Sequence, residues 1–284
     1  MVTPVWQKRK ADKMGRPPNP IDPNGSFAEH YGWKIRTLRE ERGWSLEELA
    51  EKLVCSPSHL SRLERALKSP DRQIARLLDT TFGTTYFSEH WLLAARDRLS
   101  APARSLAEHE AEARIVRAYM PTLVVGPLQT EDYARAIVKA GAYRADVDVI
   151  VAERMRRQAV LGRENGPRIH AVMDEMALRR RIGGPDVLRA QLDRLLEEMT
   201  RPNVTIQAVP ADIGEYPGLP GGFELLSLAE GPDVAYVEGT TGMGRMVEDP
   251  AAIAAIHETY DLVRAVALPV NITAQLIKEI RDTL

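Results

Sequence analysis

The sequence of 284 residues contains one cysteine and no long apolar run. With Cys55 alone no intrachain disulfide can form, which excludes the disulfide-stapled scaffolds of small secreted domains. No apolar stretch approaches the roughly 20 residues that a membrane helix needs. The polar, proline-rich N-terminus also lacks the apolar segment of a signal peptide. We therefore expect a cytoplasmic protein that does not enter a membrane.

Common enzyme motifs are missing as well. The chain has no HExxH, CxxC, P-loop or GxSxG motif, and its six histidines are scattered. Asp174 and Glu175 are adjacent, so their side chains would diverge on a regular element, and an ion-pair role is favoured over acid-base catalysis. The glycine-rich run 239–244 lacks the dinucleotide-binding spacing and is interpreted as a hairpin turn. We expect no enzyme activity, no cofactor and no metal site.

Charge is unevenly distributed along the chain. Residues 1–100 hold 17 Lys+Arg and 13 Asp+Glu, a net charge of +4, whereas residues 101–284 hold 21 and 27, a net charge of −6. All four tryptophans also lie in the first part. These differences indicate two separately built modules with different tasks.

The first module begins with a basic segment and continues with helix signals. Residues 1–25 mix five prolines with five Lys or Arg residues, which predicts a flexible basic arm. Residues 26–99 carry signals for five short helices, the first ending near Gly43 and the last running from Ser88 to Leu99. The predicted N-terminal caps of the first four helices are Ser26, Ser45, Ser56 and Ser69.

The third of these helices has one polar face. At 100° per residue, Leu60, Leu63 and Leu67 fall on one side, with serine and arginine side chains opposite. Arginine can bind a guanine edge with two hydrogen bonds, and serine or histidine can reach a base or a phosphate. The predicted DNA-binding residues are Ser56, Pro57, Ser58, His59, Ser61, Arg62 and Arg65. The alternative reading is a solvated face in a small helical bundle, and Cys55 just before it is interpreted as a buried small residue rather than a redox switch.

The spacing in this module resembles that of the lambda-repressor-like helix-turn-helix family. The matching segments are Ile35–Arg39, Ser45–Ala50 and Ser56–Glu64. The resemblance implies that the second of the two closely spaced helices enters the major groove of DNA. It also implies a structural ion pair between Arg39 and Glu64. Ala66 stands where the family usually has glycine, so we expect the recognition helix to continue or to end differently.

The second module mixes helices and strands. Helices are predicted near residues 105–119, 130–140, 147–162, 185–199, 250–267 and 272–283, and strands near 169–173, 204–209, 223–228, 234–238 and 243–247. Short Gly/Pro turns between the later strands favour antiparallel pairing. The predicted fold is α+β overall: an all-α five-helix head over residues 26–99, then an α+β domain over residues 105–284 with a mainly antiparallel sheet.

Four segments of the second module carry a further resemblance. These are Gly126–Ala136, Ala152–Gln158, Asp174–Arg181 and Gly218–Phe223. In this order they resemble the C-terminal domain of an actinobacterial regulator family, whose biochemical role is undefined. Many members are encoded beside a very small protein that is thought to act with them. The family's Pro-Gly-Leu-Leu-Gln-Thr appears here as Val125–Thr130 with the proline moved, so no ligand contact is carried over to that turn.

These observations predict a sequence-specific DNA-binding transcription regulator that associates with the nucleoid when bound. Its partners would be double-stranded DNA, a second copy of the chain, and a ligand or small acidic protein bound by the C-terminal domain. An autoregulating antitoxin or adaptor is the first alternative, and a neighbouring gene for a tiny acidic protein would favour partner binding. A DNA-linked enzyme is the second, and a deep polar pocket with clustered titratable groups would favour it or ligand sensing.

Overall fold

The computed structural model describes residues 26–96, 101–141, 147–162, 166–239 and 244–284. The chain folds as two compact units that divide between residues 97 and 98. The predicted basic arm at residues 1–25, the last residues of the predicted fifth helix and most of the glycine-rich run 239–244 lie outside the described residues.

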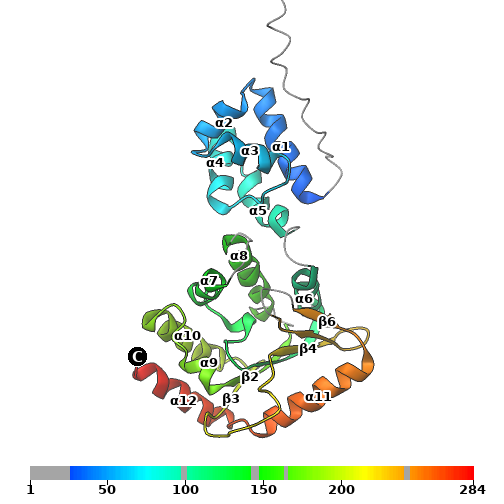
Figure 1. The fold of residues 1–284 in the computed structure, drawn as a ribbon, viewed down its shortest axis with the longest axis vertical. Helices are drawn as coiled ribbons and strands as arrows, with labels where there is room; N and C mark the ends of the chain where they lie inside the picture. Colours follow the sequence, from blue (N-terminus) through cyan, green and yellow to red (C-terminus); the bar gives the residue numbers. More distant parts are fainter. Residues whose placement is uncertain (1–25, 97–100, 142–146, 163–165, 240–243) are drawn as a thin grey trace, which may run out of the picture. The chain divides into compact units, whose positions relative to one another are not determined.

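The first unit is a bundle of five short helices, coloured blue to cyan in Figure 1. They are α1 (Phe27–Glu41), α2 (Leu46–Lys52), α3 (Pro57–Glu64), α4 (Arg72–Phe82) and α5 (Tyr86–Arg96). Each helix contributes a fully buried side chain to the core, namely Ile35, Leu49, Leu60, Leu78 and Phe87. Burial of apolar side chains from every helix compensates for helices that are too short to be stable alone.

Local capping sets where these helices begin. In both predicted capping boxes, Ser26 with Glu29 and Ser45 with Glu48, the serine oxygen and the glutamate each accept a backbone N–H, so these predictions are confirmed. The predicted cap of the fourth helix is wrong. Asp71, not Ser69, is the N-cap of α4, because its carboxylate accepts the Ile74 N–H at 2.7 Å.

The second unit is built on a six-stranded sheet with the strand order β3-β2-β1-β4-β5-β6. The strands are β1 (Ala113–Met120), β2 (Arg168–Asp174), β3 (Val204–Val209), β4 (Phe223–Leu228), β5 (Val234–Val237) and β6 (Arg245–Val247). β1, β2 and β3 are parallel, and the remaining pairs are antiparallel. The sheet is therefore mixed, and the prediction of a mainly antiparallel sheet is wrong. Helical crossovers after β1 and β2 bring the chain back to the end of the sheet where the previous strand began, so the next strand runs parallel to it.

The central strand β1 was predicted as the end of a helix. Helix α6 (Ala101–Glu112) stops where β1 begins, with no turn between them. Within β1 the buried Val116, Ala118 and Met120 face one large core, while Tyr119 belongs to the core on the opposite face. This period of two is the mark of a strand, but it spans too few residues to stand out after a helical run.

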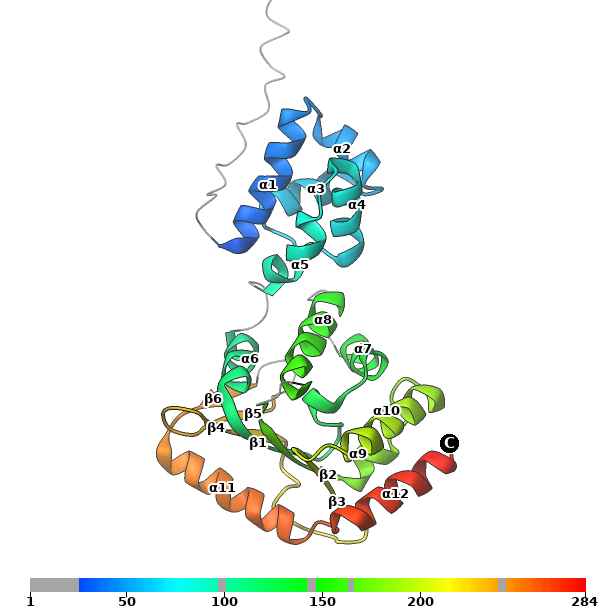
Figure 2. The same ribbon diagram turned by 180° about the vertical axis from the view of Figure 1, so that it is seen from behind.

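Helices cover both faces of this sheet (Figures 1 and 2). The further helices are α7 (Glu131–Ala140), α8 (Val147–Gln158), α9 (Glu175–Arg179), α10 (Pro185–Glu198), α11 (Pro250–Ala265) and α12 (Val270–Asp282), with short 3₁₀ turns at Gly126–Leu128 and Ala159–Gly162. α6 to α10 lie over the larger core, α12 packs beside α10 and β3, and α11 crosses the opposite face over β3, β4 and β5. In the part of the chain that the structure describes, no helix is both long and apolar enough to cross a membrane.

Candidate nucleic-acid interface

The sequence around α3 forces a short, sharply bounded helix. The Ser56 hydroxyl oxygen accepts the His59 N–H at 3.2 Å, and Pro57 occupies the first helical position, where its missing N–H costs nothing. Leu60 and Leu63 are buried in the head core. These two leucines fix which side of α3 faces inward, so the opposite side must face solvent.

The seven predicted DNA-binding residues all lie on α3 or at its ends. Of these, Ser56, Pro57, Ser58, Arg62 and Arg65 are exposed, whereas His59 and Ser61 are half-buried. His59 Nδ1 lies 3.3 Å from Lys68 Nζ, so this imidazole is engaged at the rim of the face. We call the exposed side of Ser56–Arg65 the α3 face.

The α3 face carries positive charge only. Glu64, the single acidic residue of the segment Ser56–Arg65, is buried outside this face and its charge is neutralised by Arg39. Arg62 and Arg65 therefore stand among serines with no exposed carboxylate on the same helix. α2 differs, because Glu47, Glu48 and Glu51 are all exposed there, and of the two helices only α3 suits a polyanion.

A buried ion pair holds α3 against α1. Arg39 Nε donates to Glu64 Oε1 at 2.6 Å, Nη2 donates to Glu64 Oε2 at 3.0 Å, and Nη1 donates to the Trp44 carbonyl at 3.0 Å. The two residues that the resemblance paired are thus joined by a bidentate contact, which fixes orientation as well as distance. Hydrogen bonding to Glu64 raises the pKa of Arg39 and keeps it charged.

Close packing at Gly32 supports the same arrangement, and the sequence interpretation missed it. A Cβ atom on Gly32 would lie 2.4 Å from the Glu64 carbonyl oxygen, closer than real atoms approach. Gly32 sits in the middle of α1, where glycine lowers helix stability. Gly32 in the middle of a predicted helix could have indicated, from the sequence alone, that another helix crosses close to it.

Both ends of α3 adjoin a left-handed residue that is not glycine. Val54 in the turn before it and Ala66 after it each have φ of 52°. The helix stops at Glu64, and the backbone takes the conformation that glycine prefers although alanine occupies the position. Leu67, which the projection of a longer helix placed on the same side as Leu60 and Leu63, lies beyond this end and is 43% exposed, so the stripe does not extend to it.

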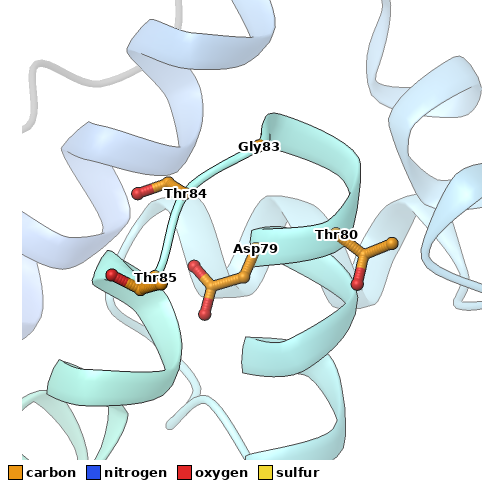
Figure 3. A pocket seen from close by; sticks show the side chains of 5 residues that line it. All are labelled: Asp79, Thr80, Gly83, Thr84 and Thr85. Atoms are coloured by element: carbon orange, nitrogen blue, oxygen red, sulfur yellow. The ribbon is translucent and has the colours of Figure 1, made fainter.

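Two other features of the head offer no binding chemistry. Burial raises the pKa of Cys55, so its thiol stays protonated and poorly reactive. A hollow lined by Asp79, Thr80, Gly83, Thr84 and Thr85 is shown in Figure 3. The Asp79 carboxylate there accepts the Phe87 and Ser88 N–H groups at 2.9 and 2.7 Å, so it caps α5.

In the second unit, residues of the family-like segments make structural contacts. Arg154 of α8 donates to the Gln129 side chain at 2.6 Å, and Gln158 donates to the Gln129 carbonyl at 2.7 Å. Glu175 pairs with Arg179 at 2.6 Å, and the Asp174 carboxylate accepts the Met176 N–H and the Tyr216 hydroxyl. The turn with the moved proline is thus held by α8, and the adjacent acids are used in structural contacts.

Comparison with known proteins identifies both units. A family model described as a helix-turn-helix domain matches residues 30–86, and a model described as a domain of unknown function (DUF5753) matches residues 103–279. No curated protein and no solved structure matched the chain. The second match spans more than half of the sequence, so the chain belongs to the DUF5753 family and carries a helix-turn-helix domain ahead of it.

Proposed function

We propose that this protein is a sequence-specific transcription regulator of the lambda-repressor-like type, in which α3 enters the major groove of double-stranded DNA. The observation that carries the proposal is the α3 face, a helical surface with exposed arginines and hydroxyl groups and no exposed carboxylate. A helix of this width fits the major groove, where donor and acceptor patterns distinguish all four base pairs.

The residues of the α3 face divide into base readers and phosphate binders. Arg62, one turn before Arg65 and flanked by Ser58 and Ser61, is the residue placed to read a guanine. Ser56 accepts an internal hydrogen bond but keeps its hydroxyl proton to donate to a phosphate. Arg65 at the end of the helix supplies positive charge for the DNA backbone.

Replacing Arg62 by alanine tests this assignment. We expect specific binding to weaken by about 1–3 kcal/mol and the preference at one base position to relax. Arg76→Ala is the matched control, because Arg76 is also exposed but lies on α4. Selection from random DNA, followed by titration of the selected sites, measures both effects. Equal sequence preference in wild type and Arg62→Ala would show that another surface reads the DNA.

For the second unit we propose that it senses a ligand or binds a small acidic protein, and that it pairs two copies of the chain. A segment that only joined two heads would not need to be this large or to have two apolar cores of its own. We expect the regulator to act in the cytoplasm and on the nucleoid. Purification from the native host followed by mass spectrometry distinguishes a protein partner from a ligand.

We do not propose an enzyme, and one constellation supports that choice. Ser227, Asp233 and His257 lie together, with Ser227 Oγ and His257 Nε2 each 3.0 Å from the same oxygen of Asp233. The carboxylate therefore stands between hydroxyl and imidazole. In hydrolytic triads the imidazole must contact the hydroxyl to take its proton, so this group is better suited to linking β4, β5 and α11.

A further inference from the structure

Val54, in the turn between α2 and α3, is the most exposed large apolar side chain among the described residues. It is 86% exposed, whereas Leu67 and Leu93, the other exposed large apolar residues of the head, are 43% and 42% exposed. Its neighbours in the chain are anchored, because Leu53 is buried and Cys55 is half-buried. The side chain of Val54 therefore points outward and contributes almost nothing to the apolar core of the head.

The backbone of Val54 is held in a conformation that valine disfavours. Its φ of 52° lies in the left-handed region, where a side chain branched at Cβ crowds its own backbone. The Val54 N–H donates to the Glu51 carbonyl at 3.1 Å and the Cys55 N–H donates to the Ala50 carbonyl at 2.9 Å, so the end of α2 fixes this conformation. Glycine could make the same hydrogen bonds without strain and without exposing apolar surface.

The place of Val54 in the chain brings it close to the proposed DNA-reading surface. Backbone strain and exposed apolar surface coincide at this residue without a benefit to folding, and strain of this kind is retained where it serves a function. Val54 precedes Ser56, the N-cap of α3, by two residues, so their Cα atoms are at most about 7.6 Å apart. Recognition helices of this type contact base edges with their N-terminal residues. Val54 therefore lies beside the end of α3 that reads DNA in the proposed function.

Chemistry and surroundings limit what Val54 can contact. Glu51, Lys52 and Ser56 are exposed around it, so a single valine does not provide the broad surface that a protein interface needs. Phosphate does not suit an isopropyl group either, because this group offers neither positive charge nor a hydrogen-bond donor. On the base edges of the major groove, the apolar group is the C5 methyl of thymine. That methyl group is the DNA feature that matches the side chain of Val54.

We propose that Val54 is a specificity-determining residue that reads a thymine, with its isopropyl group in contact with the C5 methyl of that base. The inference rests on the proposed function and adds an apolar contact to the polar ones of the α3 face. Such a contact removes both methyl surfaces from water, and it is lost when cytosine or uracil, which have no C5 methyl group, takes the place of thymine. Val54 then contributes to base preference rather than to general affinity for DNA.

Replacing operator thymines one at a time by deoxyuridine tests this contact, because the exchange removes only the methyl group. The operator is first selected from random DNA with the full-length wild-type protein. We expect at least one thymine whose replacement weakens wild-type binding about fourfold, the value of one buried carbon. For Val54→Ala the same replacement should change the Kd by less than about 1.5-fold, because the partner of the methyl group is gone. Leu93→Ala, which truncates an exposed aliphatic side chain on α5, should keep the wild-type dependence on that thymine.

Val54→Gly separates base contact from structure. It should raise the unfolding midpoint of the head by relieving the left-handed strain, yet weaken operator binding about fourfold or more. A purely structural residue would shift stability and affinity in the same direction. Operator binding by Val54→Gly as tight as that of wild type, or equal uracil effects in wild type and Val54→Ala at every thymine, would overturn the inference while leaving the proposed function intact. A wild-type protein that selects no preferred sequence would refute the proposed function and the inference with it.

Discussion

Arg39 of α1 and Glu64 of α3 share two hydrogen bonds, 2.6 and 3.0 Å long, in the interior of the head. Since α3 contributes only Leu60 and Leu63 to the apolar core, this pair supplies much of what fixes its orientation. The orientation of Arg62 toward DNA therefore depends on an ion pair whose two residues are buried and do not contact DNA themselves.

Glu64→Gln should destabilise the head by about 3–5 kcal/mol, because it leaves the Arg39 guanidinium buried without a counter-charge. Urea unfolding followed by tryptophan fluorescence reports this unit alone, since all four tryptophans lie in residues 1–100. Glu40→Gln is the control: Glu40 is exposed, pairs with Arg36 across one helical turn and reaches Arg39 only at 3.5 Å, so its loss should cost about 0.5 kcal/mol or less. Equal losses in the two variants would contradict a special role for the buried pair.

Glycine at either left-handed position should stabilise the head. Val54→Gly and Ala66→Gly should each gain about 1 kcal/mol, because a left-handed L-residue costs roughly 1–2 kcal/mol and the greater unfolded-state freedom of glycine cancels part of it. Gly83→Ala is the reverse test, since Gly83 has φ of 70° and nothing lies within 4 Å of an added Cβ atom. Gly83→Ala should lower the free energy of unfolding of the head by a similar amount. Unchanged unfolding midpoints in all three would show that this backbone strain is negligible.

The stability of the second unit should fall as pH rises from about 5 to 8. Burial raises the pKa of Glu224 from the usual 4.5 of a glutamate to about 8, so the folded protein binds this proton more tightly than the unfolded chain. The stabilisation from protonated Glu224 is complete below the pKa of this residue in the unfolded chain. It is lost as pH rises toward the pKa in the folded protein, at a slope of about 1.4 kcal/mol per pH unit at most. Glu224→Gln should flatten the profile. Denaturant unfolding monitored by circular dichroism measures the free energy of unfolding across this pH range. Identical pH profiles for wild type and Glu224→Gln would count against a buried proton on Glu224.

The intact chain should be a dimer, and residues 1–100 alone should bind the operator at least about tenfold more weakly while remaining folded. Joined heads gain affinity through effective concentration at half-sites about one helical turn apart. Light scattering reports assembly, and fluorescence reports folding of the head. A full-length protein that stays monomeric at micromolar concentration, with operator affinity equal to that of the isolated head, would refute pairing by the second unit.

The sequence anticipated the head well because local signals decide its structure. Ser26–Glu29 and Ser45–Glu48 are capping boxes that act within one turn. The Arg39–Glu64 contact is not local, and it was expected only because the family resemblance implied it. The errors arose where competing local signals were close together. Ser69 and Asp71 are both good caps, and only the course of the chain around the buried Pro70 decides for Asp71.

The second unit was less predictable because its pairings are distant. Strand limits at 204–209 and 223–228 could be placed from alternation and turns, whereas parallel pairing depends on how helices return the chain. The burial of Glu224 had no sequence signal at all. Glu224 stands beside apolar residues in β4, and only the folded domain shows that it is buried there.

The direct passage from α6 into the central strand also has a consequence for biosynthesis. Ile115 of β1 pairs with Arg168 and Ser227, about 50 and about 110 residues further along the chain. A strand whose partners are made so late cannot enter a sheet until most of the domain has left the ribosome. The head, whose five helices follow one another closely, can complete its core much earlier. During each round of translation a DNA-binding unit should therefore exist for some time before the unit that would regulate it.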